Sequence, residues 1–252
     1  MSSYLYAYAF FQLPFGLLAV SLMTTLAPDL ASAATRGDLG ELRRGYSLGV
    51  RLIALVMVPA AAGYLALAGP IITALLQRGE FGATSTALTS DVLAMFALGL
   101  VPFSVYLFTL RAFYSLQDTR TPFLVNSFEN GMNVVLAFAL YPWLGVPGLA
   151  LAFSLAYVLG AGVALVALRR RIASLDGRRL ATVATRVVVA GAATALAAWA
   201  VARVLDWAGP REAVATLAVG ILAGAVVYVA SLAVLRVDEA RLLLRRRPVA
   251  GP

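Results

Sequence analysis

Long apolar runs alternate with short polar stretches along the whole chain. The sharpest break is QDTRTP at residues 117–122, which separates an apolar run over 86–110 from another over 123–143. Charged and hydrogen-bonding side chains do not stay in hydrocarbon. Pro122 also suits the first turn of a new helix, where its missing N–H costs nothing. The pattern therefore predicts a tight turn at a membrane surface between two spanning helices.

The same alternation predicts seven spanning helices, because each run approaches or exceeds the roughly 20 apolar residues that cross a bilayer. We expect them at about 4–27, 46–68, 87–116, 122–141, 145–168, 180–202 and 213–235. A shorter apolar piece at 71–76 predicts an interfacial or re-entrant segment near 70–77. The expected fold is an all-α polytopic membrane protein, with a five-span lobe over 1–171, a helix pair over 172–235 and a basic tail over 236–252.

Composition supports a membrane protein and removes several kinds of chemistry. Hydrophobic residues make up 62% of the chain, above the roughly 45–50% of soluble domains. The lack of Cys and His excludes disulfides and the usual zinc sites, and it removes the usual general base. We therefore expect no enzyme, cofactor or metal. We also expect no nucleic-acid partner despite the net charge of +8, because basic loops in membrane proteins mainly set topology.

All 20 basic residues are arginines, and their positions predict the orientation of the chain. Fourteen lie on one side of the predicted spans, whereas the loops of the other side hold Arg78 and Arg211. Cytoplasmic loops carry the excess of positive charge, so the first side, with the C-terminus, is expected to be cytoplasmic. Seven spans then place the N-terminus outside. We interpret this as the loss of an upstream part with an odd number of spans; the alternative is a short translocated tail.

Helix-breaking residues interrupt the first three spans. Membrane proteins tolerate proline where neighbouring helices or a water-filled cavity satisfy the freed backbone groups. Three interrupted spans in a row favour a transporter that changes shape, although proline is also common in membrane helices generally. The last two spans lack internal proline, and the spacing of Gly220 and Gly224 favours close packing. The interrupting residues are Pro14, Gly16, Pro59, Gly63, Gly99 and Pro102. The candidate gating or structural positions are Pro14, Gly16, Pro59 and Pro102, with Pro122 at the start of the fourth span.

Polar residues inside the fourth span are the deepest candidates for a functional site. Glu129 lies about eight residues into the span, and Asn126, Asn130 and Asn133 share its helical face by the i, i+3, i+4, i+7 rule. Ionisable groups at membrane depth are costly and often functional. The stripe predicts substrate or ion contact at a cavity; the alternative is hydrogen bonding between helices by a neutral Glu129.

Two arginines lie within one to two turns of the cytoplasmic ends of the second and third spans. Arg51 and Arg111 are suited to hold a phosphate headgroup that enters from the cytoplasm. The alternatives are snorkelling to the interface and pairing with lipid phosphates. Arg186 and Arg203 are expected to snorkel, and the basic tail to contact anionic lipid or anchor the topology.

A series of short motifs indicates a resemblance to a known family. They are QLPFGLLAVSLMTTLAPDLA at 12–31, Gly49-Val50-Arg51-Leu52 with Val58-Pro59-Ala60-Ala61, Pro70 followed by QRGEF at 77–81, Gly99, AFYSLQDTRTP at 112–122, Asn133-Val134-Val135-Leu136 and GVPGLALA at 145–152. Each is weak alone, and the combination is specific. Over residues 4 to about 171, the chain resembles the C-terminal half of the MurJ/MviN family, the lipid II flippases of the MOP transporter superfamily.

The resemblance implies a transporter of fourteen spans, with two six-helix lobes around a cationic cavity and an extra C-terminal helix pair. This chain would supply the last seven spans. The implied activity is alternating-access flipping of lipid II, the undecaprenyl-pyrophosphate-linked peptidoglycan precursor, across the bacterial cytoplasmic membrane. Arg51 and Arg111 would contact the headgroup, and Glu129 with the asparagines would line the cavity. The implied partners are this precursor, membrane lipids and other proteins of cell-wall synthesis.

The sequence departs from the family at one place. Many members carry an Asp-Arg pair before the proline motif of the first span, where this chain has Tyr8 and Ala9, and Gln12 replaces a nearby acidic residue. A cavity arginine is therefore missing on this half. The alternative functions are another MOP-type exporter, against which QRGEF and AFYSLQDTRTP argue, and a non-transporting membrane scaffold in cell-wall assembly.

Overall fold

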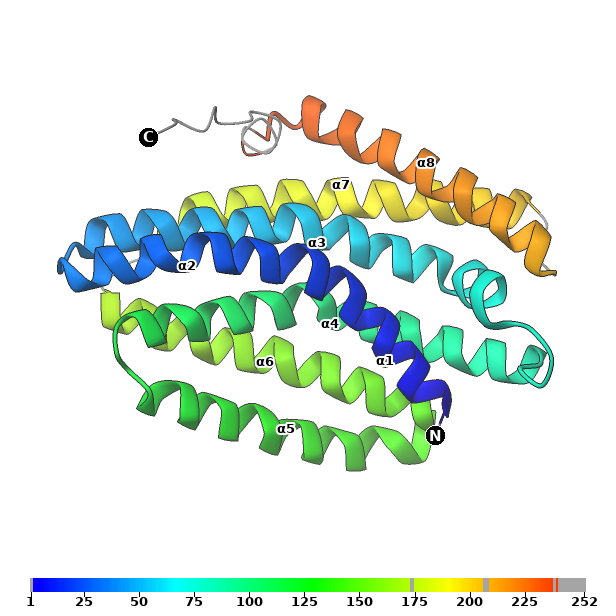
Figure 1. The fold of residues 1–252 in the computed structure, drawn as a ribbon, viewed down its shortest axis with the longest axis horizontal. Coiled ribbons are helices and arrows are strands. Elements are labelled where there is room, and N and C mark those ends of the chain that lie inside the picture. The colour runs from blue at the N-terminus through cyan, green and yellow to red at the C-terminus, as the bar shows by residue number, and fades with distance from the viewer. Residues whose placement is uncertain (1, 173–174, 206–208, 238, 240–252) are drawn as a thin grey trace, which may run out of the picture.

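The computed structural model describes residues 2–172, 175–205, 209–237 and 239, and these form helices and short connections without a strand (Figure 1). Counting α1, η1 and α2 as one, seven helical segments are long and apolar enough to cross a membrane. The predicted all-α fold with seven spans is confirmed. The elements are α1 (Ser2–Pro14), the π-helical turn η1 (Phe15–Ala19), α2 (Val20–Thr35), α3 (Leu39–Leu76), α4 (Ala83–Ser115), α5 (Arg120–Leu144), α6 (Val146–Ile172), α7 (Gly177–Val204) and α8 (Pro210–Val234).

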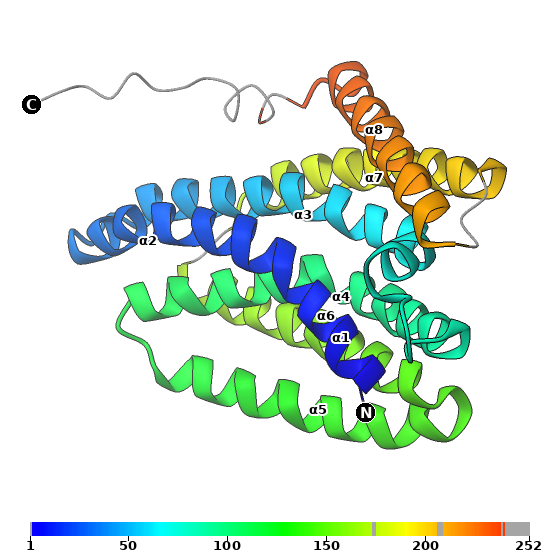
Figure 2. The same cartoon turned by 45° about the vertical axis from the view of Figure 1, so that its right-hand side comes forward.

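Successive spans run in opposite directions, so the connections alternate between two ends of the bundle (Figures 1 and 2). The α2–α3 and α4–α5 turns lie at one end, together with the end of α6 and the start of α7. We call this the basic end, since Arg36, Arg44, Arg120, Arg170 and Arg179 belong to these segments. Of the expected basic tail at 236–252, residues 238 and 240–252 lie outside the described residues.

The first span contains a π-helical turn, which is wider than an α-helical one, immediately after its proline. Pro14 ends α1, and η1 follows before α2 continues. Pro14 has no N–H for the carbonyl of Phe10, four residues earlier. The Tyr64 hydroxyl of α3 donates a hydrogen bond to that oxygen at 2.7 Å. A neighbouring helix thus satisfies the backbone group that proline frees, as hydrocarbon surroundings require.

The second span repeats this arrangement at Pro59. Its missing N–H frees the carbonyl of Leu55, which accepts a hydrogen bond from the Tyr228 hydroxyl of α8 at 2.6 Å. Tyr228 and Leu55 are both buried. The proline of α3 therefore creates a specific attachment point for the last span.

The bend in α3 lies between Pro59 and the C-terminal end of the helix. Leu67 has φ −116° and ψ 15°, three residues before Pro70, and the helix then resumes as far as Leu76. The residues expected to form a separate interfacial or re-entrant piece are the last turns of α3, and several of them are buried. Their depth in a membrane stays a prediction. By contrast, α4 is one helix across Pro102.

Aromatic rings from three helices fill the core. Phe11 of α1, Phe96 and Phe103 of α4 and Phe153 of α6 have ring centroids 5.3–5.9 Å apart in the pairs that touch. Such offset and edge-to-face contacts add to the energy of apolar burial. The core therefore holds α1, α4 and α6 together, and the remaining spans pack around it.

The outer helices attach through glycines. A Cβ on Gly191 of α7 would lie 2.3 Å from a methyl of Val58 in α3, so only glycine allows this approach. The predicted Gly220 and Gly224 pair serves two neighbours, since Gly220 faces Leu67 of α3 and Gly224 faces Thr194 of α7. The last two helices thus pack on each other and on α3, while the domain boundary at residue 171 stays a prediction.

The α4–α5 turn is built from two capping devices. Gln117 adopts a left-handed φ of 58°, and the Asp118 N–H donates to the Phe113 carbonyl at 3.0 Å, which ends α4. The Asp118 carboxylate then accepts the N–H of Thr121 at 3.0 Å, which begins α5. The Thr121 hydroxyl also donates to this carboxylate, at 2.7 Å, and both hydrogen bonds lower the pKa of the Asp118 carboxyl. The polar break in the sequence is therefore an ordered turn.

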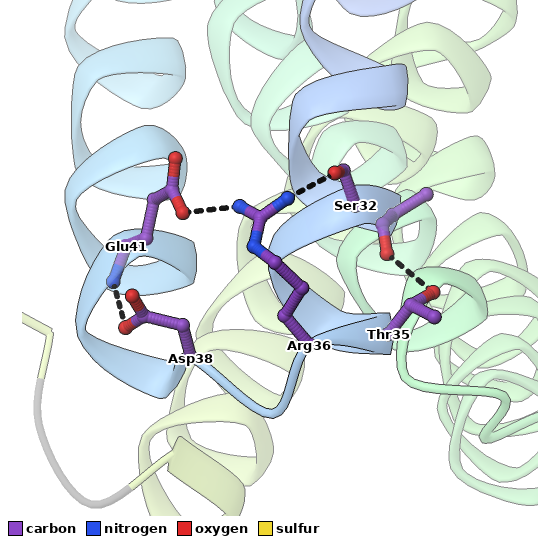
Figure 3. A network of polar contacts seen from close by, with 6 residues as sticks. Ser32, Thr35, Arg36, Asp38 and Glu41 are labelled. Carbon is purple, nitrogen blue, oxygen red and sulfur yellow. Dashed lines mark hydrogen bonds and ion pairs between the residues drawn. The ribbon is translucent and has the colours of Figure 1, made fainter.

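The α2–α3 turn uses the same devices (Figure 3). Gly37 has a left-handed φ of 70°, and the carboxylate of Asp38 accepts the N–H of Glu41 at 2.8 Å. Arg36 connects the two helices by donating to Ser32 of α2 and to the carboxylate of Glu41 in α3. Both turns at the basic end thus fix the spans they join.

Candidate functional site

Arg51, a predicted headgroup contact, lies in a buried ion pair. The residue is 7% exposed, and its partner Glu239, just beyond α8, is 4% exposed. Arg51 Nε donates to the Ser47 carbonyl at 3.1 Å, and Nη1 donates to the Glu239 carboxylate. Nη2 of Arg179, in α7, lies 3.7 Å from the same carboxylate oxygen. In this conformation the guanidinium of Arg51 is engaged within the chain.

A cavity of about 460 Å³ opens beside this ion pair at the basic end. The first turns of α7 and the turn after α8 form its walls. Nη1 of Arg186 donates to the Arg236 carbonyl at 3.2 Å, so the arginine expected to snorkel is attached to the opposite wall. The lining residues are Asp176, Gly177, Arg179, Thr182, Val183, Arg186, Arg236 and Glu239.

Arg111, the second predicted headgroup contact, is differently placed. It is partly buried one turn before the end of α4. No ion pair in the described part of the chain involves it. A guanidinium without a carboxylate partner presents its donors to anionic oxygens. Of the two predicted contacts, Arg111 is the one that the described chain leaves without a counter-ion.

The polar stripe of α5 divides into two parts. Glu129 is 1% exposed and packs on α6, since a Cβ on Gly160 would lie 3.0 Å from Glu129 Cγ. Asn126 and Asn130 are exposed, and Asn133 is partly buried. The four residues therefore share one side of α5, but only Glu129 lies inside the helix packing.

The exposed asparagines require a polar environment. The Tyr106 hydroxyl donates to Asn126 Oδ1 at 3.2 Å, and Asn130 Nδ2 donates to the Asn126 carbonyl at 2.8 Å. Each amide keeps further hydrogen-bonding capacity. Lipid tails cannot satisfy it. A cavity with water, or a polar surface of another helix, is the environment that this face of α5 suits.

A larger cavity of about 1070 Å³ lies at the opposite end, between α3, α4 and α7. Asp91, Ser90 and Gln77 line it together with Arg203, whose guanidinium carbon lies 5.0 Å from the ring centroid of Trp199. Arg203 therefore rests on an aromatic face. Among the described residues, no cluster of three or more carboxylates offers a metal site.

Glu239 is the functional candidate that sequence reasoning missed. It falls within the segment predicted as a basic tail, three residues after Arg236. An acidic residue among arginines was the available signal. Its partner Arg51 lies 188 positions earlier, and no local pattern connects positions so far apart.

Comparison with known proteins decides the family. A family model described as "Lipid II flippase MurJ" matches residues 1–214. The chain belongs to the MurJ family. The resemblance predicted from the motifs is therefore confirmed, and the match extends beyond them into the start of α8. Together with seven apolar helices, the family indicates a multi-pass protein of a bacterial inner membrane.

Individual MurJ relatives are longer than this chain. A "Probable lipid II flippase MurJ" from Rhizobium meliloti (strain 1021) is 35% identical over 152 residues, which are 60% of this chain and 28% of the relative. Another, from Haemophilus influenzae, is 30% identical over 247 residues, which are 93% of this chain and 48% of the relative. The chain thus spans about half the length, or less, of these relatives.

A solved MurJ structure shares the fold. The structure titled "Lipid II flippase MurJ, inward closed conformation" has a TM-score of 0.77 and 22% sequence identity. The match covers 97% of this chain and 48% of that one. The seven helices are therefore arranged as in about half of a MurJ transporter.

Proposed function

We propose that this chain forms part of a flippase that moves lipid II, an undecaprenyl-pyrophosphate-linked peptidoglycan precursor, across the bacterial cytoplasmic membrane. The observation that carries the proposal is the match to the lipid II flippase family over residues 1–214. Because the chain spans about half of its relatives or less, we assign it part of the transport path. No catalysis is assigned to it.

Charge complementarity is the proposed basis of headgroup binding. Arg111 has no ion-pair partner within the described residues, and its planar guanidinium matches the oxygens of a pyrophosphate. Asn126 and Asn130 offer amides from the exposed side of α5, and Asn133 extends that side. Glu129 holds α5 on α6 beneath them. Arg51 joins the headgroup contacts only when its ion pair with Glu239 opens.

Alternating access is the proposed mode of movement, with the basic end and the C-terminus in the cytoplasm. The π-helical turn η1, which follows Pro14 and contains Gly16, and the bend at Leu67 in α3 support this mode. Such turns are frequent at functional sites, and broken helices are typical of transporters. Pro59, Pro102 and Pro122 complete the proposed gating and structural positions.

Substitution of Arg111 in the complete transporter tests this proposal. Arg111→Ala should lower lipid II translocation about tenfold or more, because one charge-assisted hydrogen bond is lost, and Arg111→Lys should retain an intermediate rate. The readout is the outer-leaflet fraction of lipid II, measured with a membrane-impermeant probe. Arg203→Ala, at the opposite end, is the matched control.

The outcome separates the rival functions. Unchanged flipping by Arg111→Ala removes this residue from the mechanism. Movement of other lipid-linked glycans without lipid II indicates another exporter of the superfamily. A complete transporter that moves no lipid, yet binds proteins of cell-wall synthesis, indicates a scaffold.

A further inference from the structure

The ion pair between Arg51 and Glu239 places a carboxylate where two helices converge. One oxygen of Glu239 contacts Arg51 of α3 and lies 3.7 Å from Arg179 of α7. Both members of the main pair are more than nine-tenths buried. A negatively charged oxygen at this point is therefore stabilised by guanidinium groups from two separate spans.

The neighbouring cavity has an excess of positive charge. Arg179, Arg186 and Arg236 line its 460 Å³, opposed by Asp176 and Glu239. Glu239 is already neutralised by Arg51, which lies outside the lining. The guanidinium of Arg186 is held by the Arg236 carbonyl at 3.2 Å, so a donor group is fixed at the wall before any ligand arrives.

The start of α7 also favours an anion. The 28-residue helix α7 begins at Gly177 in the cavity wall, without a side-chain cap on its first N–H groups. The positive end of its dipole therefore points at the cavity.

We propose that this cavity is a binding site for a phosphate group, and that Glu239 is the occupant supplied by the chain itself. The phosphate is ligated by Arg179, Arg186 and the start of α7, and it competes with Glu239 for Arg179. When Glu239 leaves, Arg51 becomes available as well. The site lies on the side of α3 that faces α7 and the segment after α8. It shares Arg51 with the proposed headgroup contacts, whereas its main ligands, Arg179 and Arg186, have no role in the proposed transport.

The substitution Glu239→Gln tests the competition. The full chain is placed in phosphatidylcholine nanodiscs, with inorganic pyrophosphate as the probe, and binding is measured by titration calorimetry. Glu239→Gln should bind pyrophosphate about tenfold tighter than the unsubstituted chain, because the competing carboxylate is gone. Glu212→Gln, which changes net charge equally at the exposed start of α8, should bind as the unsubstituted chain does. Equal affinity of the two variants would overturn the proposal.

Thermal unfolding keeps the proposal testable if Glu239→Gln folds poorly, because an anion that replaces the carboxylate stabilises the folded state. At about 100 times its Kd, pyrophosphate should raise the Tm of the unsubstituted chain by roughly 5–10 °C. The double variant Arg179→Gln/Arg186→Gln should lose this shift. The charge-matched double variant Arg169→Gln/Arg170→Gln at the end of α6 should keep it. If both double variants lose the Tm shift, or if the unsubstituted chain shows no shift, the result contradicts a site in this cavity.

Phosphatidylglycerol nanodiscs identify the source of the phosphate. If this lipid raises Tm, weakens pyrophosphate binding and fails to act on Arg179→Gln/Arg186→Gln, the ligand is a membrane headgroup. If pyrophosphate binds equally in both kinds of nanodisc, the ligand is soluble. Either result supports a phosphate site. If pyrophosphate does not bind in either kind of nanodisc and phosphatidylglycerol does not raise the Tm, the proposal is overturned.

Discussion

At the scale of single residues, the α4–α5 turn depends on Asp118. This residue ends one helix with its backbone N–H and begins the next with its carboxylate. The polar break in the sequence predicted a turn there, and an Asp two residues before a helix is a recognised sequence signal for capping. The left-handed conformation of Gln117 was not readable, since glycine or asparagine usually holds that position. The hydrogen bonds of Asp118 at the two helix ends, rather than the residue type at position 117, therefore determine the conformation of this turn.

Asp118→Ala should lower the free energy of unfolding by about 1 kcal/mol, because the start of α5 loses its cap. Hydrogen bonds from Thr121 lower the folded-state pKa of Asp118. Its contribution is therefore present above the unfolded pKa of about 4, and it is lost as the pH falls through the folded pKa. Thermal unfolding in detergent at pH 7 and pH 3 should show the difference from the unsubstituted chain shrinking in acid. A difference that stays constant contradicts this role for the carboxylate.

At the scale of helices, two prolines join their spans to other spans through tyrosines. The prolines were evident in the sequence, and so was the need for a partner to the freed carbonyl. The partners were not, because Tyr64 and Tyr228 lie 54 and 173 positions from the carbonyls they serve. Proline thus acts here as a connector between helices, and the sequence predicted only the disruption.

Tyr228→Phe should lower the free energy of unfolding by about 1–3 kcal/mol, because a buried carbonyl of Leu55 loses its donor. In a Pro59→Ala background the loss should be half or less, since residue 59 then supplies an N–H for the same carbonyl. Thermal unfolding of the four variants gives this comparison directly. Tyr141→Phe, at an exposed position, is the control. Equal losses in both backgrounds would contradict the proposed link to proline.

At the scale of the whole molecule, hydrophobic length and arginine positions predicted the seven spans and their alternation, because a bilayer imposes both. The candidate site was less predictable. The face of Glu129 and its asparagines followed from helical periodicity, but which of them would be buried depended on Gly160 of another helix. The engagement of Arg51 depended on Glu239, which is distant in sequence. Contacts between distant segments were the information that local patterns lacked.

The chain has no cysteine, so single cysteines report its orientation without background. Glu80→Cys, in the α3–α4 connection, should react with a membrane-impermeant maleimide added outside intact cells. Gln117→Cys, in the α4–α5 turn, should react only after permeabilisation, because the basic end is expected to be cytoplasmic. Both positions are exposed, so accessibility within the fold does not bias the comparison. The reverse pattern would invert the proposed topology.

The unequal lengths of the spans have a consequence for the surrounding lipid. The 38 residues of α3 measure about 57 Å along the helix, and the 25 residues of α5 about 38 Å. A typical hydrocarbon layer is about 30 Å thick. Two upright spans of such different length cannot both match a bilayer of uniform thickness. The longer span therefore has to tilt or bend, as α3 does at Leu67, or the bilayer has to thicken beside it.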